Sequence, residues 1–125
     1  MIYGVGTDLI RVARIGAVLE RHPQRFAQRL LHAQELAQYA QSRRPANFLA
    51  KAWAAKEAFG KALGTGVRGY DNPDVGCVRA ELGRPQMVFS PRMRTRLDAM
   101  GVGAAHVSLS DEDGVVLAFV VLERA

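Results

Sequence analysis

The segment from Pro45 to Gly66, PANFLAKAWAAKEAFGKALGTG, limits the possible folds more than any other part of this chain. A proline stands where a helix tolerates one, in its first turn, and two glycines stand where a helix ends. Apolar residues recur between them at helical spacing: Phe48, Ala52, Ala55, Phe59 and Ala62. The sequence therefore predicts one long helix with a buried stripe, around which the other elements must pack.

Several other segments have the pattern of β-strands. Ile2–Ile10 is expected to form the first strand, and DVGCVRAELGRPQMVF is expected to form two short strands around a turn at Gly83. AAHVSLS and GVVLAFVVLE predict a hairpin around DEDG. The last of these strands is apolar on both faces, so we expect it to lie centrally and to be covered on both sides.

Shorter helices are predicted between these strands. Ser90 and Pro91 are typical of a helix N-terminus, so SPRMRTRLDAM should form a helix. The other expected helices span Val12–Arg21, Arg25–Leu31 and Ala33–Gln41. This order of elements predicts an α+β fold: a small single domain, residues 1–125, with a mainly antiparallel sheet packed against the long central helix.

Composition narrows the class of protein. The chain has 125 residues, of which 49% are apolar, enough for one core. The single cysteine, Cys77, cannot form an intrachain disulfide, and the longest apolar run, Val115–Leu122, is far shorter than the roughly 20 residues of a membrane-spanning helix. We therefore expect a soluble, cytoplasmic protein with no membrane partner. The net charge of +5 comes mostly from arginine, which favours an anionic partner or simply maintains solubility.

Three charged side chains are candidates for a reactive site. Asp8 lies in an otherwise apolar strand, where a lone carboxylate is costly unless it is paired or bound to a metal. Glu57 and Lys61 are four residues apart and share one face of the long helix. They could be an ordinary surface ion pair. Alternatively, Asp8 and Glu57 could together bind a hard cation such as Mg²⁺, which prefers oxygen ligands.

The glycine-rich stretches do not form standard nucleotide motifs. GVG at Gly4–Gly6 lacks the third glycine of a dinucleotide fingerprint, because Leu9 stands in its place. GTG at Gly64–Gly66 follows the helix instead of preceding it, so a phosphate there would meet the negative end of the helix dipole. Gly64 is expected to be the helix C-cap in any case.

The first strand of the late hairpin has a polar face. Strand alternation places His106, Ser108 and Ser110 on the same side. These side chains could line a polar cleft or form an ordinary solvated face.

Taken together, three segments resemble the holo-acyl-carrier-protein synthases, the small bacterial 4′-phosphopantetheinyl transferases. They are GTDLIRVARI near the start, WAAKEAFGKALGTG in the long helix and HVSLS in the hairpin. The resemblance covers essentially the whole chain, with the segments in the expected order. It departs at Ala52, where the family usually has an arginine.

The resemblance implies a reaction and a set of roles. Such enzymes transfer the phosphopantetheine arm of coenzyme A to a serine of apo-acyl carrier protein, which gives adenosine 3′,5′-bisphosphate and supports fatty acid biosynthesis. By this resemblance, Asp8 and Glu57 would bind Mg²⁺, Glu57 would also accept the serine proton, and Lys61 would neutralise the diphosphate. The residues implied to contact coenzyme A are Lys61, Gly64, Thr65, Gly66 and His106. Family members are homotrimers with active sites between subunits.

The arginines suggest where a carrier protein would dock. Arg14, Arg21 and Arg25 are spaced to give a basic helical face, bent at Pro23. Acyl carrier proteins are acidic, so we expect this face to bind them.

Two other functions remain open. One is a non-catalytic arginine-rich module that binds RNA or an acidic protein, although the aromatic residues that stack on RNA bases are not interleaved with these arginines. The other is a family member that binds coenzyme A without transferring its arm.

Overall fold

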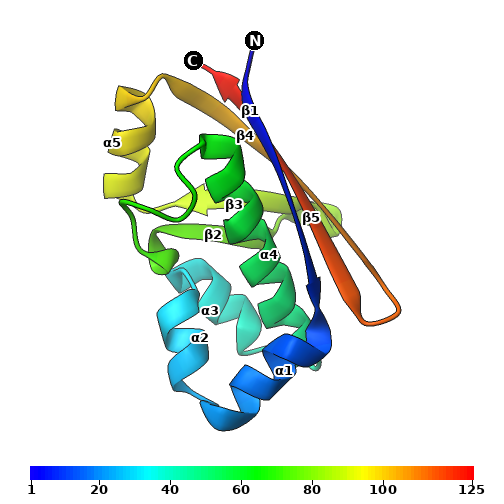
Figure 1. The fold of residues 1–125 in the computed structure, drawn as a ribbon. Helices are drawn as coiled ribbons and strands as arrows, with labels where there is room; N and C mark the ends of the chain where they lie inside the picture. The colour runs from blue at the N-terminus through cyan, green and yellow to red at the C-terminus, as the bar shows by residue number, and fades with distance from the viewer.

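The computed structural model describes residues 1–125 and has an α+β architecture, as the sequence predicts (Figure 1). A three-stranded antiparallel sheet lies along one side of the long helix α4, and a two-stranded antiparallel sheet lies on another side. The strands are β1 (Ile2–Arg11), β2 (Val75–Arg79), β3 (Pro85–Phe89), β4 (Val102–Glu112) and β5 (Val115–Arg124). The helices are α1 (Val12–Arg21), α2 (Arg25–Leu30), α3 (Ala33–Tyr39), α4 (Pro45–Leu63) and α5 (Pro91–Ala99).

The helix ends follow the local signals. Helix α4 begins at Pro45 and ends at Gly64, whose φ of 87° lets its N–H donate to the carbonyl groups of Gly60 and Lys61. Helix α5 begins after Ser90, whose hydroxyl accepts a hydrogen bond from the Met93 N–H. The predicted ends of α2 and α3 differ from the observed ends by one or two residues, as fraying termini commonly do.

Strand β5 is the central strand of the larger sheet, in the order β1-β5-β4, as its apolar sequence predicts. One face of β5 is fully buried against α4: Val116, Ala118, Val120 and Leu122. The expectation that both faces are covered is wrong for the single chain. On the outer face Leu117 and Phe119 are 40% and 41% exposed, because no element of this chain packs over them.

Glycines let β1 lie unusually close to α4. A Cβ atom at Gly4 would stand 2.0 Å from the carbonyl oxygen of Ala62, and one at Gly6 would stand 2.0 Å from that of Ala58. Neither distance is possible for a real side chain, so only glycine fits at these two positions. The GVG stretch therefore serves the contact between strand and helix, and this contact brings Asp8 to the surface of α4.

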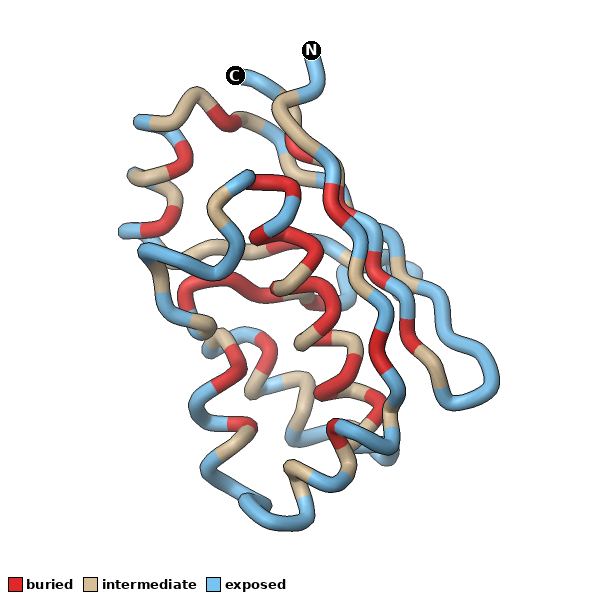
Figure 2. The backbone as a smooth tube through the Cα atoms, viewed as in Figure 1, coloured by how far each residue is buried: buried red, intermediate tan, exposed pale blue.

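The core surrounds α4, whose Ala52, Ala55, Phe59 and Ala62 are buried as predicted, whereas Phe48 of the same predicted stripe is only partly buried. Figure 2 shows the buried positions running along α4 and β2 and alternating along β5. No helix of the structure combines the length with the apolar character needed to cross a membrane.

Candidate functional site

Asp8 faces α4, and its ion-pair partner is Lys61. Its side chain points to the inner side of β1 and is only 17% exposed, while the Lys61 ammonium lies 3.5 Å from its Oδ1. The same Lys61 Nζ donates a 2.8 Å hydrogen bond to the carbonyl oxygen of Thr7. Lys61 is itself 56% exposed, so it can exchange these contacts for those of an incoming anion.

Glu57 completes a cluster of three charges with Asp8 and Lys61. Burial raises the pKa of the Glu57 carboxyl above its ordinary value, the negative charge of Asp8 raises it further, and Lys61 opposes both effects. Burial likewise raises the pKa of Asp8, against the charges of Lys61 and Arg14. The structure thus brings together the three charged residues that the sequence singled out.

The GTG stretch turns back over the last turn of α4 beside this cluster. The Gly66 N–H donates to the carbonyl of Gly60, and a Cβ at Gly60 would stand 2.7 Å from the Gly66 carbonyl carbon. The Thr65 hydroxyl donates to the carbonyl of Gly66. Gly64, Thr65 and Gly66 therefore form a tight loop next to Lys61, with little side-chain bulk between it and the solvent.

The donor set of the cluster fits a hard divalent cation. Burial raises the pKa of both Asp8 and Glu57, which means that it disfavours their charged forms. A positive charge between the two carboxylates would stabilise those charged forms. No third acidic, histidine or cysteine side chain joins them. This is the ligand set that suits Mg²⁺, which usually takes one or two carboxylates and completes its shell with water and substrate phosphate.

His106 lies apart from this cluster in the single chain. It is on the outer face of β4 with Ser108 and Ser110, whereas Asp8 is on the inner face of the same sheet. Its Nε2 lies 2.7 Å from the Glu123 carboxylate. The predicted site residues therefore lie on two different faces of the larger sheet, because strand alternation directs His106 away from Glu57.

The basic face lies next to the charged cluster. Helix α1 follows β1 directly, and the positive charge of Arg14 lowers the pKa of Asp8. Arg14, Arg21 and Arg25 are all exposed. A groove between α1 and α2 adds apolar surface, and its lining residues are Val18, His22, Arg25, Phe26 and Arg29.

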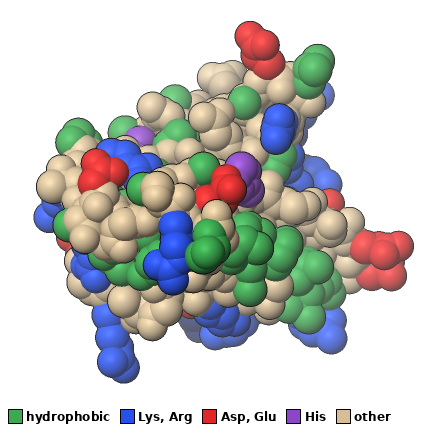
Figure 3. Space-filling model, turned by 90° about the horizontal axis from the view of Figure 1, so that it is seen from above, with side chains coloured by type: hydrophobic (Ala, Val, Ile, Leu, Met, Phe, Trp, Pro, Cys, Tyr) green, Lys and Arg blue, Asp and Glu red, His purple; other side chains and the backbone are tan.

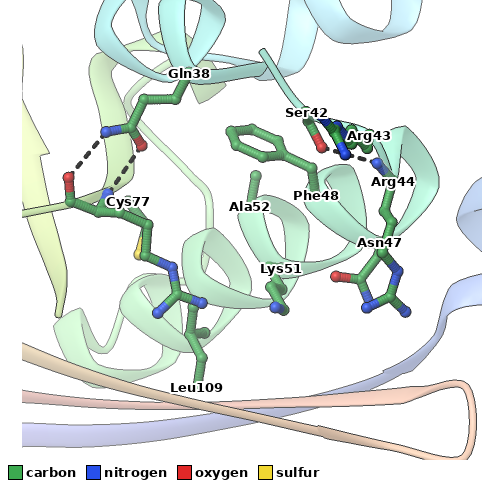
Figure 4. A pocket seen from close by; sticks show the side chains of 11 residues that line it. Gln38, Ser42, Arg43, Arg44, Asn47, Phe48, Lys51, Ala52, Cys77 and Leu109 are labelled. Carbon is green, nitrogen blue, oxygen red and sulfur yellow. Dashed lines mark hydrogen bonds between the residues drawn. The ribbon is translucent and has the colours of Figure 1, made fainter. Parts of the chain in front are cut away.

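A second basic surface is a pocket of about 300 Å³ at the start of α4 (Figure 4). Arg43, Arg44, Lys51 and Arg79 are among its lining residues. Ala52, the residue that departs from the family pattern, forms part of its wall and is 3% exposed. At 100° per residue, Ala52 points about 140° away from Glu57 around α4. One chain therefore does not bring position 52 to the carboxylates.

The sequence interpretation missed a buried ion pair at the centre of the motif helix. Lys56 is 1% and Glu35 is 0% exposed, and the Lys56 Nζ lies 2.7 Å from Glu35 Oε1. The Lys56 Nζ also donates to the carbonyls of Asn72 and Val75, so it joins α4 to α3, to the loop after α4 and to β2. A signal was present, since Lys56 is four residues after Ala52 and three before Phe59, which places its charge on the apolar side of the predicted helix.

Comparisons with known proteins all point to the same family. The family model of the 4′-phosphopantetheinyl transferase superfamily matches residues 4–119. The chain is 51% identical, over 98% of its length and 99% of the relative's, to the holo-[acyl-carrier-protein] synthase of Laribacter hongkongensis.

Solved structures agree. The chain matches the crystal structure of holo-[acyl-carrier-protein] synthase from Neisseria meningitidis with a TM-score of 0.95 and 42% identity, over 99% of this chain and 100% of that one. It also matches the Bacillus anthracis holo-(acyl-carrier-protein) synthase in complex with CoA (3′,5′-ADP), with a TM-score of 0.82 and 30% identity over 100% and 99%. The family model matches most of the chain, and the relative from Laribacter hongkongensis aligns with it over nearly its full length. The motif residue Asp8 also lies beside Lys61. The chain therefore belongs to the 4′-phosphopantetheinyl transferase superfamily.

Proposed function

We propose that this chain transfers the 4′-phosphopantetheine arm of coenzyme A to a serine of apo-acyl carrier protein, as a single domain spanning residues 1–125. The observation that carries the proposal is the cluster of Asp8, Glu57 and Lys61 in a chain of this family. The products are holo-acyl carrier protein and adenosine 3′,5′-bisphosphate. The reducing cytoplasm suits the free thiol of Cys77, and the holo product would serve fatty acid biosynthesis there.

The chain supplies positioning and charge for this reaction, which is most of what phosphoryl transfer requires. The serine oxygen attacks the phosphorus that bears the pantetheine, and the bond from that phosphorus to the bridging oxygen breaks. Glu57 accepts the serine proton, directly or through a water, and its burial favours a carboxylate that takes up protons readily. Lys61 leaves Asp8 and neutralises the charge that develops on the leaving diphosphate oxygen.

Mg²⁺ is the cation that we propose for Asp8 and Glu57. When bound, it neutralises the diphosphate oxygens and holds them beside the carboxylates. Loss of activity in a chelator and its recovery on addition of Mg²⁺ would support this assignment.

A direct test is mass spectrometry of apo-acyl carrier protein incubated with the chain, coenzyme A and Mg²⁺. The proposal expects the carrier to gain the mass of one phosphopantetheine on its serine. A chain that only binds RNA, an acidic protein or coenzyme A would leave the carrier mass unchanged, and that outcome would contradict the proposal.

We also propose that the chain assembles as a homotrimer with active sites between subunits, as the resemblance to the family implies. The outer face of the larger sheet supports an assembly, because Val5, Leu9, Leu117 and Phe119 are at least 40% exposed on it. Figure 3 looks onto the end with both termini and shows hydrophobic side chains at the surface beside an acidic and a histidine side chain. His106 lies on this outer face, where a neighbouring subunit could use it.

Replacing one residue of this face should dissociate the assembly. We expect Phe119→Asp to shift the mass measured by light scattering from trimer to monomer, because a carboxylate cannot remain buried unpaired in an apolar interface. Leu82→Asp is the matched control, since Leu82 is the most exposed leucine and lies at the turn between β2 and β3. A wild-type chain that is active and monomeric at micromolar concentration would refute the trimer.

We propose that the acidic carrier protein docks on the basic face of α1 and α2. Arg14, Arg21 and Arg25 are exposed there, and the groove with Val18 and Phe26 offers apolar contact between the charges. The position of Arg14 beside Asp8 supports this choice, because the serine must reach the carboxylates.

Charge reversal should separate carrier binding from coenzyme A binding. We expect Arg21→Glu and Arg25→Glu each to raise the KM for carrier protein at least tenfold at low salt, with less effect at high salt. The KM for coenzyme A should remain unchanged. Arg14→Glu should affect both, because Arg14 also acts on Asp8.

The matched control for these reversals is Arg124→Glu at the opposite end of the molecule (Figure 1). Equal KM values for the wild type and the Arg21 and Arg25 variants at every salt concentration would remove the docking proposal.

We propose that the basic pocket beside Ala52 takes a phosphate of coenzyme A. Ala52→Arg should add a guanidinium to a wall that already presents Lys51 and Arg79, and the pocket has room for it. We therefore expect the KM for coenzyme A to fall severalfold. Ala52→Met, which adds bulk without charge, should not lower it. An unchanged KM for Ala52→Arg would show that this pocket does not contact coenzyme A.

A further inference from the structure

His106 and Glu123 are in direct contact on the outer face of the larger sheet. The Nε2 atom of His106 lies 2.7 Å from Oε2 of Glu123, and both side chains are about half exposed. His106 of β4 stands opposite Val121 of β5, and Glu123 is the next residue of β5 on the same face, so the two are diagonal neighbours. An ion pair with this exposure contributes little to stability, so its main effect is on the orientation of the imidazole ring.

The contact determines which nitrogen of the ring is free. The hydrogen bond with His106 lowers the pKa of the Glu123 carboxyl, and the N-terminal amino group lowers it further, so this group is ionised at neutral pH. An ionised carboxylate can only accept a hydrogen bond, and therefore Nε2 of His106 carries the hydrogen between them. Nδ1 is then the ring atom that remains available to a ligand.

His106 stands at the border between a groove and the exposed apolar face of the sheet. The groove, of about 710 Å³, lies between β4 and the β2–β3 hairpin, and the hairpin contributes one cation, Arg84, and one acid, Glu81, to its lining. On the other side, Val121 separates His106 from Val5, which is part of the apolar face that we propose to meet a neighbouring subunit. The ring is therefore placed where a ligand held between subunits would pass.

We propose that Glu123 is a positioning residue for His106: its carboxylate accepts the Nε2–H and so holds the ring with Nδ1 directed at coenzyme A bound between this subunit and its neighbour. The inference rests on the proposed function and assembly, because these place coenzyme A between subunits. A ring that is already held in one orientation loses less conformational freedom when the ligand binds, and this is how Glu123 increases the affinity without touching the ligand.

The kinetic test compares Glu123→Ala with Glu123→Gln. We expect Glu123→Ala to raise the KM for coenzyme A about tenfold, with kcat and the KM for carrier protein changed less than twofold. Glu123→Gln should raise it at most about threefold, because its amide oxygen accepts the same hydrogen bond. His106→Ala should match Glu123→Ala, and the double variant should show no further rise, since both changes remove one interaction.

A nuclear magnetic resonance measurement tests the ring directly. In the ¹⁵N-labelled chain, with the His106 signals assigned by their loss in His106→Ala, coenzyme A should shift the Nδ1 signal and leave Nε2 nearly unchanged. The matched control is Glu112→Ala, which removes an exposed glutamate at the far end of β4 and should leave the KM for coenzyme A unchanged. Melting temperature and the mass from light scattering should be those of the wild type in every variant.

Several outcomes would overturn the inference. An unchanged KM for coenzyme A in Glu123→Ala, or an equal rise in Glu123→Gln, would show that hydrogen-bond acceptance by Glu123 does not act on the ligand. A shift of Nε2 in place of Nδ1 would show that the ring is not held as proposed, and dissociation of Glu123→Ala would assign Glu123 to assembly instead. An inactive wild-type chain would refute the proposed function, whereas the shifts of the ring nitrogens do not depend on turnover, so the two failures are distinguishable.

Discussion

Asp8→Asn and Glu57→Gln are each expected to abolish at least 99% of phosphopantetheine transfer while the fold is retained. Each substitution keeps the shape of the side chain and removes one negative charge from the cluster. In either variant, a cation bound between the two carboxylates loses one of its two negatively charged protein ligands. Glu57→Gln also removes the group proposed to accept the serine proton. The mass gain of the carrier protein measures the transfer.

Two controls distinguish this loss from unfolding. Asp98→Asn removes a carboxylate that is 68% exposed and pairs only with Arg94 on α5, so it should leave turnover unchanged. Circular dichroism should show wild-type melting for Asp8→Asn, because Lys61 is more than half exposed and can be hydrated when its partner is removed. Full turnover by either active-site variant at low Mg²⁺ would contradict a shared cation site.

Breaking the buried pair of Lys56 and Glu35 is expected to give the largest loss of stability. Lys56→Met leaves the Glu35 carboxylate without a cation, although the N–H groups of His32 and Cys77 still donate to it. Glu35→Gln leaves a buried ammonium among carbonyl groups. Removing one partner of a buried ion pair costs about 3–5 kcal/mol, since the remaining charge stays out of water.

Urea unfolding of both single variants and of the double variant measures this effect. The double variant should lose much less stability than the sum of the single losses, because neither uncompensated charge remains. Asp98→Asn again provides the reference, as an exposed pair of this kind contributes about 0.3–0.5 kcal/mol. Single losses below about 1 kcal/mol would mean that water reaches Lys56 and that the pair does not anchor α4.

Much of the architecture could be predicted because local rules act within a few residues. Pro45 and Gly64 set the ends of α4, and Ser90 sets the start of α5, through backbone geometry that depends only on neighbours. The central place of β5 followed from apolar residues on both of its faces. Within the candidate site, the four-residue spacing placed Glu57 and Lys61 on one side of a helix before any tertiary contact was known.

Other features could not be predicted because they depend on segments far apart in the chain. The apolar residues of β1 suggested a buried strand, yet Val5 and Leu9 lie exposed on its outer face. The polar face of β4 could have lined the site, yet the sheet directs His106 away from Asp8. A hydropathy pattern shows that a strand has two different faces but does not show which face meets the helix.

The sequence by itself determined the elements, their order, the central strand and the residues of the motif, since each depends on propensity, capping or periodicity along the chain. Only the tertiary structure decided that Gly4 and Gly6 let β1 approach α4 closely enough for Asp8 to meet Lys61. It also decided that Lys56 and Glu35 are buried together and that Glu123 lies beside His106. The physical reason is that burial, pairing and charge coupling are properties of distances between segments, which chain folding sets and linear spacing does not contain.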